Sequence, residues 1–561
     1  MRAPSRHSWL VDASCLAVLL LMSWKLLHGL ERVVDLGMWD EADYLRRGLT
    51  LSWSHLPAAE WGPLYSIWYS VLSGLWPEPV ALFYANHQLL CVLTTVGAYV
   101  LMRRMGTRPV LALLGSAVYL LSSAPHILPR PTLLALLVLQ VAWVGASFLE
   151  VEGFWAVIAG GLLLASFARP ELFVAFLLAT ALFLGLLVRG ALREGRASRE
   201  RRVALATGFA LGVVVLMQVL GNPFGDTQGR RFYAFCQHFA VNHVKHTQGS
   251  VDAWNECQRV SRAVFGEVDT VGEALRSNPE AFLWHVGVNV KAFAGASLAL
   301  FSRGPGGLSA TRGPWELARM GRRLLLLAVV WQGVRLLMRW RRWRAALAEP
   351  GLQRMAGVLA VVEVPIVLSA VLLMPRDHYL VIQGVLVLAF LALLGSRVDS
   401  GEATRPMEWV PHGLLALGLV VLTPNLARRF PADTKDSQTH LVHLRTVRAI
   451  AALGLVERLG RGEQLLLLEA SGGYDAYLGR RYFPVLREAR EKTFGGLLRE
   501  RAVTAILLDD ALRQHRRFRH DADFQAFQRD PAAFGFTLVP LDSPHAAALA
   551  IPSSGRVSLG P

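Results

Sequence analysis

The chain has 561 residues, 53% of them hydrophobic, and a formal net charge of +16 at pH 7. This composition excludes an ordinary soluble protein and is typical of a polytopic membrane protein. The positive charge by itself would suggest a nucleic acid partner. The arginines, however, concentrate in short loops between apolar runs, which is a pattern of membrane topology, so we expect no nucleic acid partner.

Long apolar runs recur from Val11 to Val421. A membrane-spanning helix needs roughly 20 mostly apolar residues to cross about 30 Å of hydrocarbon. We therefore predict an all-α polytopic membrane domain with about eleven transmembrane helices, at residues 11–30, 84–102, 109–124, 131–149, 154–168, 171–188, 203–221, 323–338, 355–374, 378–395 and 409–424. No small-residue cleavage site follows the first run, so it is expected to be an anchor and not a removed signal.

Three arginine clusters set the predicted orientation. Loops rich in Lys and Arg are typical of the cytoplasmic side, and eleven spans bring the N-terminus and all three clusters to that side. The C-terminal tail is then extracytoplasmic. The clusters are Arg103, Arg104 and Arg108; Arg189, Arg193, Arg196, Arg199, Arg201 and Arg202; and Arg339, Arg341, Arg342, Arg344 and Arg354.

Three sizeable segments lie outside in this topology, at 31–84, 221–322 and 426–561. We assign residues 1–425 to the membrane domain and 426–561 to an extracytoplasmic domain. Within the first segment, the short aromatic stretch 61–76 is expected to lie in the membrane interface. Asn278–Phe301 opens with the helix-start signal Asn-Pro-Glu. It is either an interfacial helix or a twelfth span, which would place the tail inside.

The tail is predicted to be a small soluble α/β domain. Strand candidates lie at 464–468 and 505–508, a helical pattern lies at 494–501, and residues 536–541 and 546–551 fit a terminal hairpin. Its sequence contains no phosphate loop, paired cysteine motif or nucleophile elbow. We therefore expect a supporting or acceptor-recognition role for the tail.

The segment Asp35–Gly48, directly after the first apolar run, carries four carboxylates. A carboxylate that faces water can take a proton from a hydroxyl or amine as that group attacks, which makes Asp40 and Glu41 candidate catalytic residues. The alternative is a solvated acidic helix in a loop. Asp35 and Asp43 are expected to cap helices or to be solvated.

Three arginines lie at helix ends on the same predicted side as this segment: Arg130, Arg169 and Arg376. One guanidinium group can bind two phosphate oxygens at once, and it stabilises a departing phosphate. Each arginine could instead extend to lipid headgroups or pair with a neighbouring acid. Taken together, the three predict a phosphate-binding site.

Four short segments resemble the C-type membrane glycosyltransferases, which share the GT-C fold. They are Trp39-Asp-Glu-Ala-Asp-Tyr44, Trp61-Gly-Pro-Leu-Tyr65, Ala168-Arg-Pro-Glu171 and Pro375-Arg-Asp-His-Tyr379. Their pattern is most similar to glycosyltransferase family 39 and its relatives, the protein O-mannosyltransferases and the lipid A aminoarabinose transferases. The resemblance covers roughly residues 10–425 in layout. Where the aminoarabinose transferases carry Lys before a Pro-Pro pair, this chain has Trp61-Gly62, so one phosphate contact of that family is missing.

The resemblance implies an enzyme of the cell envelope, in a bacterial-type inner (plasma) membrane. It would transfer a sugar from a polyprenyl-phosphate donor to a lipid, glycan or protein acceptor on the periplasmic face. By this similarity Asp40 is the general base, and Glu41 orients it or contacts the acceptor. The donor phosphate falls to Arg130, Arg169 and Arg376, and weaker candidates for substrate contact are Tyr44, Tyr65, Arg230, Arg231, His378 and Tyr379.

The second outside segment carries three histidines, His238, His243 and His246. Residues 238 and 243 are five apart and fall on different helix faces, so a solvated or substrate-facing helix is favoured over a metal site. The sequence requires no cofactor, and no residue pattern supports a divalent metal. Cys236 and Cys257 either form a disulfide in an oxidising compartment or remain free thiols.

A transporter or flippase of a lipid-linked sugar is the alternative function, because it would need the same arginines but no base. Transporters usually keep charged sites near the bilayer midplane and show repeated halves. Here the charges gather at one face and no internal repeat is evident. A noncatalytic assembly protein would leave both the acidic segment and the arginines unexplained. A membrane glycosyltransferase is therefore the predicted function.

Overall fold

The computed structural model describes residues 6–52, 54, 56–193, 196–225, 229–302, 334, 338, 345–398, 409–429, 441–458, 463–486, 493–501, 503–543 and 547–553. The chain is mostly helical, with a small sheet near the C-terminus. It divides into two compact units, and each is described separately. The first unit comprises residues 1–26, 57–64 and 89–424, and the second comprises 27–56, 65–88 and 425–561.

Six helices in the described part of the chain are long and apolar enough to cross a membrane, and they indicate a multi-pass membrane protein. They are α1 (Arg6–Leu27), α4 (Pro79–Arg104), α8 (Leu172–Ala191), α9 (Arg196–Leu220), α16 (Pro350–Leu372) and α17 (Asp377–Val398). Six of the eleven predicted spans are therefore confirmed as helices of spanning length.

Four further predicted spans coincide with shorter apolar helices: α5 (Pro109–Leu121), α6 (Pro131–Ala146), α7 (Val151–Ser166) and α18 (Trp409–Leu422). Sixteen helical residues extend only about 24 Å, less than the hydrocarbon thickness. Prolines at the first positions of α5 and α6 set where these helices begin. The predicted span at 323–338 lies almost wholly outside the described residues.

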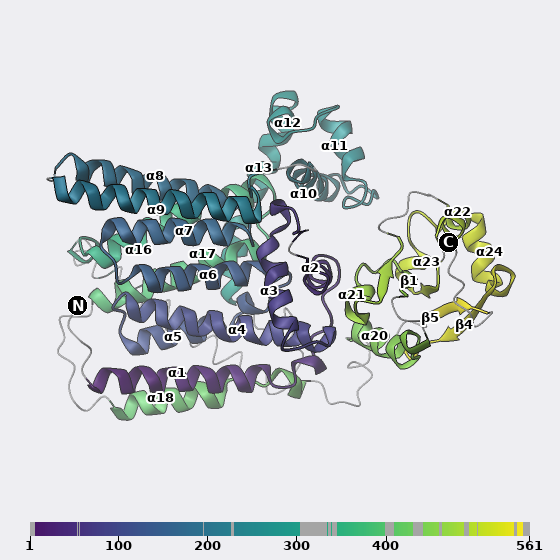
Figure 1. Ribbon diagram of the computed structural model, residues 1–561, viewed down its shortest axis with the longest axis horizontal. Coiled ribbons are helices and arrows are strands. Elements are labelled where there is room, and N and C mark those ends of the chain that lie inside the picture. The colour runs from purple at the N-terminus through teal and green to yellow at the C-terminus, as the bar shows by residue number, and fades with distance from the viewer. Residues whose placement is uncertain are drawn as a thin grey trace. The chain divides into compact units, whose positions relative to one another are not determined.

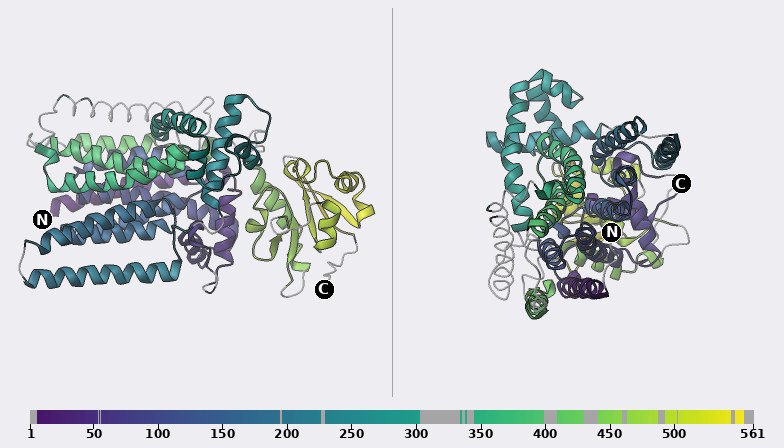
Figure 2. Two further views of the ribbon diagram at one scale, coloured as in Figure 1. Left: turned by 90° about the horizontal axis from the view of Figure 1, so that it is seen from above. Right: turned by 90° about the vertical axis from the view of Figure 1, so that its left-hand side faces the viewer.

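The apolar helices of the first unit run side by side (Figure 1). Helix α6 packs on α7 and α7 on α8, while α17 packs on α5, α6 and α16. The right-hand view of Figure 2 looks along these helices. Helices that are apolar on all faces are typical of membrane-spanning segments.

Four helices of the first unit fall in residues 221–322: α10 (Arg230–Thr247), α11 (Cys257–Phe265), α12 (Val271–Ser277) and α13 (Pro279–Ser302). The predicted start of α13 is confirmed, because Asn278 Oδ1 accepts a hydrogen bond from the Ala281 amide at 3.0 Å. Helix α13 is not among the six described helices of spanning character. Cys236 and Cys257 lie in the same aromatic cluster of this region as buried free thiols.

The second unit contains a five-stranded mixed sheet in the order β2-β1-β3-β5-β4. Its strands are β1 (Leu465–Leu468), β2 (Tyr482–Pro484), β3 (Ala505–Leu508), β4 (Phe536–Pro540) and β5 (Ala548–Pro552). Strands β2, β1 and β3 are parallel, and β4 and β5 form an antiparallel hairpin whose β5 pairs with β3. Four strands were expected near these positions from the sequence, and only β2 was not predicted.

The helices of the tail are α20 (Val442–Ala452), α21 (Tyr474–Leu478), α22 (Phe494–Glu500), α23 (Asp510–Arg513) and α24 (Ala522–Arg529). The second unit also contains α2 (Asp40–Leu49) and most of α3 (Pro63–Ser73). Helix α2 packs directly against α21. The tail is thus grouped with residues 27–56 and 65–88, most of which the sequence analysis assigned to a loop of the membrane domain.

Candidate functional site

The predicted acidic segment forms the short helix α2, which begins at Asp40. Its acids lie in the first turn and its two arginines in the last, an order that the helix dipole favours. Asp43 forms ion pairs with Arg46 and, at 2.8 Å, with Arg47. Asp40 is exposed at the first position of the helix.

Glu41 has a different environment, since only 1% of it is exposed. Its Oε1 accepts hydrogen bonds from the hydroxyls of Tyr65 at 2.7 Å and Tyr69 at 2.5 Å. Asn86 Nδ2 donates to both of these hydroxyls, at 2.7 Å and 2.9 Å. Trp68 Nε1 completes the network by donating to Asn86 Oδ1 at 2.8 Å. Every member therefore has a partner, and such a network fixes the carboxylate firmly.

Tyr44 belongs to the same aromatic group. Its ring meets that of Tyr65 edge-on at 5.1 Å between centroids, and Tyr65 lies 5.0 Å from Tyr69. The two predicted substrate contacts Tyr44 and Tyr65 are thus brought together with Glu41, as buried side chains. The two acids of the predicted catalytic pair divide into an anchored Glu41 and a water-facing Asp40.

Asp35 caps a helix, as predicted, but the helix belongs to the tail. Its carboxylate accepts the backbone amides of His443 at 3.0 Å and Leu444 at 2.8 Å, at the start of α20. A carboxylate at a helix N-terminus satisfies amides that have no partner within the helix.

In the first unit, Arg169 lies in the turn between α7 and α8. It pairs with Glu171, and its guanidinium lies over the Tyr379 ring at 4.8 Å. The pairing with a neighbouring acid is the alternative that the sequence left open for this residue. Arg169 and the predicted substrate contact Tyr379 are therefore adjacent.

Arg376 is exposed just before α17, and its guanidinium lies 5.5 Å from the centre of the Trp254 ring. The charges of Arg169 and Arg376 both act on His378, and that of Arg376 also acts on His238. His238 meets the same Trp254 ring edge-on at 5.5 Å. The structure thus groups four of the predicted residues, Arg169, Arg376, His378 and Tyr379, in the first unit.

Arg130 is fully buried beside the start of α6. Its charge acts on Cys91 and His126. Burial is the main cause that lowers the pKa of His126 to about 4, and the Arg130 charge acts in the same direction. The surroundings of Arg130 thus differ from those of the exposed Arg376.

Arg230 and Arg231, the other predicted substrate contacts, pack on aromatic rings of the first unit. Arg230 lies 3.8 Å from the centre of the Trp61 ring and donates to the Glu60 carbonyl. Arg231 lies over Phe224 and donates to its carbonyl at 2.6 Å. Residue Gly62, next to Trp61, adopts a φ of +64°, and a Cβ there would lie 2.8 Å from the Ala168 carbonyl oxygen. The Trp-Gly segment thereby lies against the turn that carries Arg169.

His238 is the one histidine of α10 that is buried. Its Nδ1 is 2.6 Å from the Ala234 carbonyl oxygen, and its Nε2 has no hydrogen-bond partner among the described residues. Burial lowers the pKa of His238 to about 4, so the ring is neutral at pH 7. In the described ranges, no group of three or more His, Cys, Asp or Glu side chains is arranged to hold a metal.

A pocket in the first unit has a lining that includes none of these residues. It is lined by residues of α1, α4, α16 and α17, among them Asp12, Tyr99, Arg103 and Arg354. Asp12 accepts from Tyr99 at 2.7 Å and pairs with Arg103. None of the predicted site residues lines this pocket.

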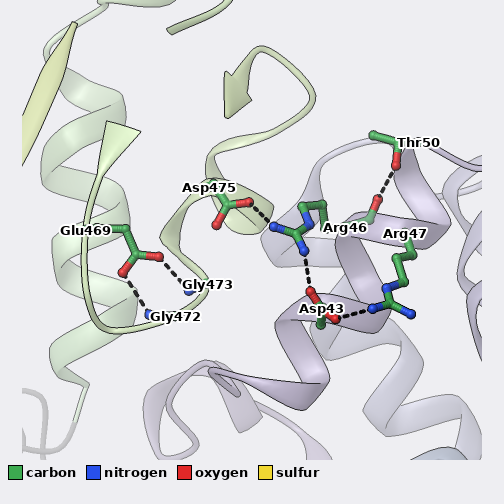
Figure 3. A network of polar contacts seen from close by, with 8 residues as sticks. All are labelled: Asp43, Arg46, Arg47, Thr50, Glu469, Gly472, Gly473 and Asp475. Carbon is green, nitrogen blue, oxygen red and sulfur yellow. Dashed lines mark hydrogen bonds and ion pairs between the residues drawn. The ribbon is translucent and has the colours of Figure 1, made fainter. Parts of the chain in front are cut away.

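Acidic residues of the tail gather where the parallel strands β1 and β3 end. Glu469 follows β1, and its two carboxylate oxygens accept the amides of Gly472 and Gly473, each at 2.8 Å (Figure 3). Burial is the main cause that raises the pKa of Glu469 to about 7; the charges of Asp475 and Asp509 act in the same direction, and the hydrogen bonds from the two amides act in the opposite direction. Ser471 donates to Asp509 at 2.7 Å.

The raised pKa of Glu469 predicts a pH dependence of stability. The folded chain holds this proton more tightly than the unfolded chain, where the pKa of Glu is about 4.3, so stability falls as pH rises from there through 7. We expect hydrogen exchange of the β1 amides to report a loss of up to about 3 kcal/mol between pH 5 and pH 8. Glu469→Gln should flatten this dependence; a dependence that is unchanged in the variant would assign it to other groups.

Several residues around the acidic helix were not predicted as functional: Tyr69, Gly472, Gly473, Glu469 and Asp475. Tyr69 had a local signal, because it lies one helical turn after Tyr65 on the same face of α3. The tail residues had none, since Asp475 is separated from its partner Arg46 by 429 positions.

Comparison with known proteins adds no identification. No family model matches the chain, and no curated protein or solved structure matches it.

Proposed function

We propose that the chain is an integral-membrane glycosyltransferase that transfers a sugar from a polyprenyl-phosphate donor to an acceptor on the outer face of a bacterial-type inner membrane. The observation that carries the proposal is the pair Asp40–Glu41. One carboxylate is exposed at a helix start, and the next is anchored by two tyrosines. An exposed acid held at a fixed position is what a general base requires.

The proposed reaction is a displacement at the anomeric carbon of the donor sugar. Asp40 removes a proton from the acceptor hydroxyl or amine while that group forms a bond to the anomeric carbon. The bond between the anomeric carbon and the phosphate oxygen breaks, and polyprenyl phosphate leaves with the electron pair. Asp40 then returns its proton to water.

The leaving phosphate is assigned to the arginines of the first unit. Arg376 is exposed and Arg169 lies near it, which supports their role as phosphate ligands. Cationic donors placed where negative charge develops lower the barrier to departure. Arg130 is assigned the same role because the sequence places it at a helix end on the same predicted side as Arg169 and Arg376, and Tyr379 and His378 are assigned contacts to the sugar.

We further propose the full topology of eleven spans, with the N-terminus in the cytoplasm and the tail outside it. The four shorter apolar helices α5, α6, α7 and α18 supply four of the remaining spans, and residues 323–338 supply the last. The apolar composition of α5, α6, α7 and α18 and the packing of these four helices on the longer ones support this count. A reporter fused after Pro561 that is active only outside the cytoplasm is the expected result, and cytoplasmic activity would contradict the topology.

A reconstituted assay tests the function. Vesicles containing the full chain are supplied with a panel of radiolabelled polyprenyl-phosphate hexoses and pentoses, together with lipid, glycan and peptide acceptors. If the chain is a glycosyltransferase, the label moves from the donor to an acceptor as polyprenyl phosphate is released. Label that changes leaflet in the intact donor, without transfer to any acceptor, would favour the flippase.

Arg376→Ala is expected to weaken donor binding by roughly tenfold or more, because charge-assisted bonds to phosphate contribute about 1.5–3 kcal/mol. The affinity for the acceptor should stay within about twofold. Donor and acceptor affinities are measured by titration of detergent-solubilised protein. Arg259→Ala is the matched control, since Arg259 is an exposed arginine of the same unit whose ion pair, with Glu256, is local. Unchanged donor affinity in Arg376→Ala would remove Arg376 from the phosphate site.

A further inference from the structure

Trp39, directly before Asp40, has an unusual backbone conformation. Its φ of 58° and ψ of −114° lie outside the regions that residues with a side chain normally adopt. The residue is 62% exposed, so burial does not explain the conformation. A strained residue persists only where its surroundings determine it, and such residues cluster at functional sites.

The contacts that hold Trp39 come from the tail. Its backbone amide donates to the Gly472 carbonyl oxygen at 2.8 Å. A Cβ at Gly472 would lie 2.7 Å from Cε3 of the Trp39 ring, and one at Gly473 would lie 2.4 Å from the Ala42 Cβ. Only residues without a side chain allow this approach, so the Gly472–Gly473 turn fits closely against the first turn of α2.

The turn itself is fixed from within the tail. Glu469 accepts both glycine amides, as Figure 3 shows, and Gly472 has a φ of +76°. Such a φ favours glycine on conformational grounds as well. The carboxylate of Glu469, buried after strand β1, thereby determines where the Gly472 carbonyl points.

A second set of contacts holds the other end of α2. Asp475 Oδ2 lies 3.3 Å from Arg46 Nη1, and Arg46 also pairs with Asp43, which in turn binds Arg47 (Figure 3). Before the helix, the Tyr477 hydroxyl donates to the Gly37 carbonyl at 2.6 Å. Residues of the tail therefore contact the acidic segment before Asp40, at its neighbour Trp39, and near the end of α2.

We propose that the C-terminal domain is a positioning device for the candidate base: its Gly472–Gly473 turn holds Trp39 in the strained conformation and thereby orients Asp40 and Glu41. Gly472 and Asp475 are positioning residues, because they act through α2 and do not touch substrate. The catalytic meaning of this orientation rests on the proposed glycosyltransferase function. The contact between the tail and α2 does not depend on that function, and its test requires no measurement of activity.

The test uses the full chain in lipid nanodiscs and two glycine variants. Gly472→Ala adds a methyl group against the Trp39 ring, whereas Gly535→Ala is the matched control. Gly535 lies in the same domain with a φ of +78° and has nothing within 4 Å of an added Cβ. Both variants therefore place a side chain at nearly the same positive φ, and only Gly472→Ala disturbs Trp39.

Hydrogen exchange of the α2 amides is the first readout. We expect Gly472→Ala to accelerate their exchange at least tenfold and Gly535→Ala to leave it within twofold. Asp475→Asn, which keeps the size of the side chain and leaves the turn intact, is expected to accelerate exchange at the Arg46 end of α2. If Gly472→Ala fails to fold, Asp475→Asn still tests whether contacts from the tail hold α2. Unchanged α2 exchange in the folded variants would overturn the proposal.

Transfer kinetics are the second readout. A positioning role predicts that Gly472→Ala lowers kcat at least tenfold and leaves the KM for the donor within about twofold, with unfolding midpoints equal to those of Gly535→Ala. A loss of transfer without faster α2 exchange would also overturn positioning. If the wild-type chain transfers no sugar but Gly472→Ala still accelerates α2 exchange, the contact between the tail and α2 is supported. Only the proposed glycosyltransferase function is then rejected.

Discussion

Asp40→Asn is expected to lower the rate of sugar transfer by roughly 100- to 10,000-fold, the contribution typical of a general base. Asparagine has nearly the same shape but cannot take up the proton. Because Asp40 is exposed and makes no ion pair among the described residues, the unfolding midpoint should change little. The loss should appear in kcat, with the affinity for the donor retained.

The control for this variant is Asp510→Asn. Asp510 is also an exposed aspartate at the first position of a helix, in α23 of the tail. Asp510→Asn removes the same negative charge from the first turn of a helix and leaves the candidate base unaltered. The interaction of such a charge with the helix dipole contributes about 0.3–1 kcal/mol. Transfer by Asp40→Asn at more than half the wild-type rate would exclude Asp40 as the base.

Glu41→Ala is expected to lower the free energy of unfolding by about 3–5 kcal/mol. The substitution leaves a cavity and removes the acceptor of two buried hydroxyls, those of Tyr65 and Tyr69. A buried donor left without an acceptor costs about 1–3 kcal/mol, and the lost packing adds to this. Denaturant titration of detergent-solubilised protein measures the change.

A double-mutant cycle shows whether this loss arises from the tyrosines. Glu41→Gln keeps the volume and one acceptor oxygen, so it should be much milder than Glu41→Ala. The coupling between Glu41→Gln and Tyr69→Phe should be on the order of 1 kcal/mol or more, as expected for groups in direct contact. A Glu41→Ala protein with wild-type stability would show that the carboxylate contributes no anchoring.

The sequence predicted the helical framework well because apolar runs determine it locally. The long runs that became α4, α8 and α17 lie within a few residues of their expected positions. Helices α5 and α6 are shorter than expected, since the runs continue past the point where the backbone leaves the helix. Strand β2 was missed because Tyr482–Pro484 has only three residues, too few for any alternation to be recognised.

The candidate site was predictable in its residue types but not in its pairings. An acidic segment after an apolar run is a local signal, and it led to both Asp40 and Glu41. That Glu41 is buried depends on Tyr65, Tyr69 and Asn86, whose contacts with it or with each other no local pattern specifies. The cap that Asp35 provides for α20 spans 408 positions and is equally invisible to local reasoning.

The cap that Asp35 provides for α20 means that the tail is not an independent structural module of this chain. The tail begins after the last apolar helix and folds around its own sheet, so it resembles an appended domain that could be exchanged between related proteins. The start of α20, however, depends on Asp35, and the Gly472–Gly473 turn is shaped to Trp39 and Ala42. A functional graft must therefore transplant residues 27–56 and 65–88 together with 425–561, and substitutions on the two sides of this contact should be inherited as pairs.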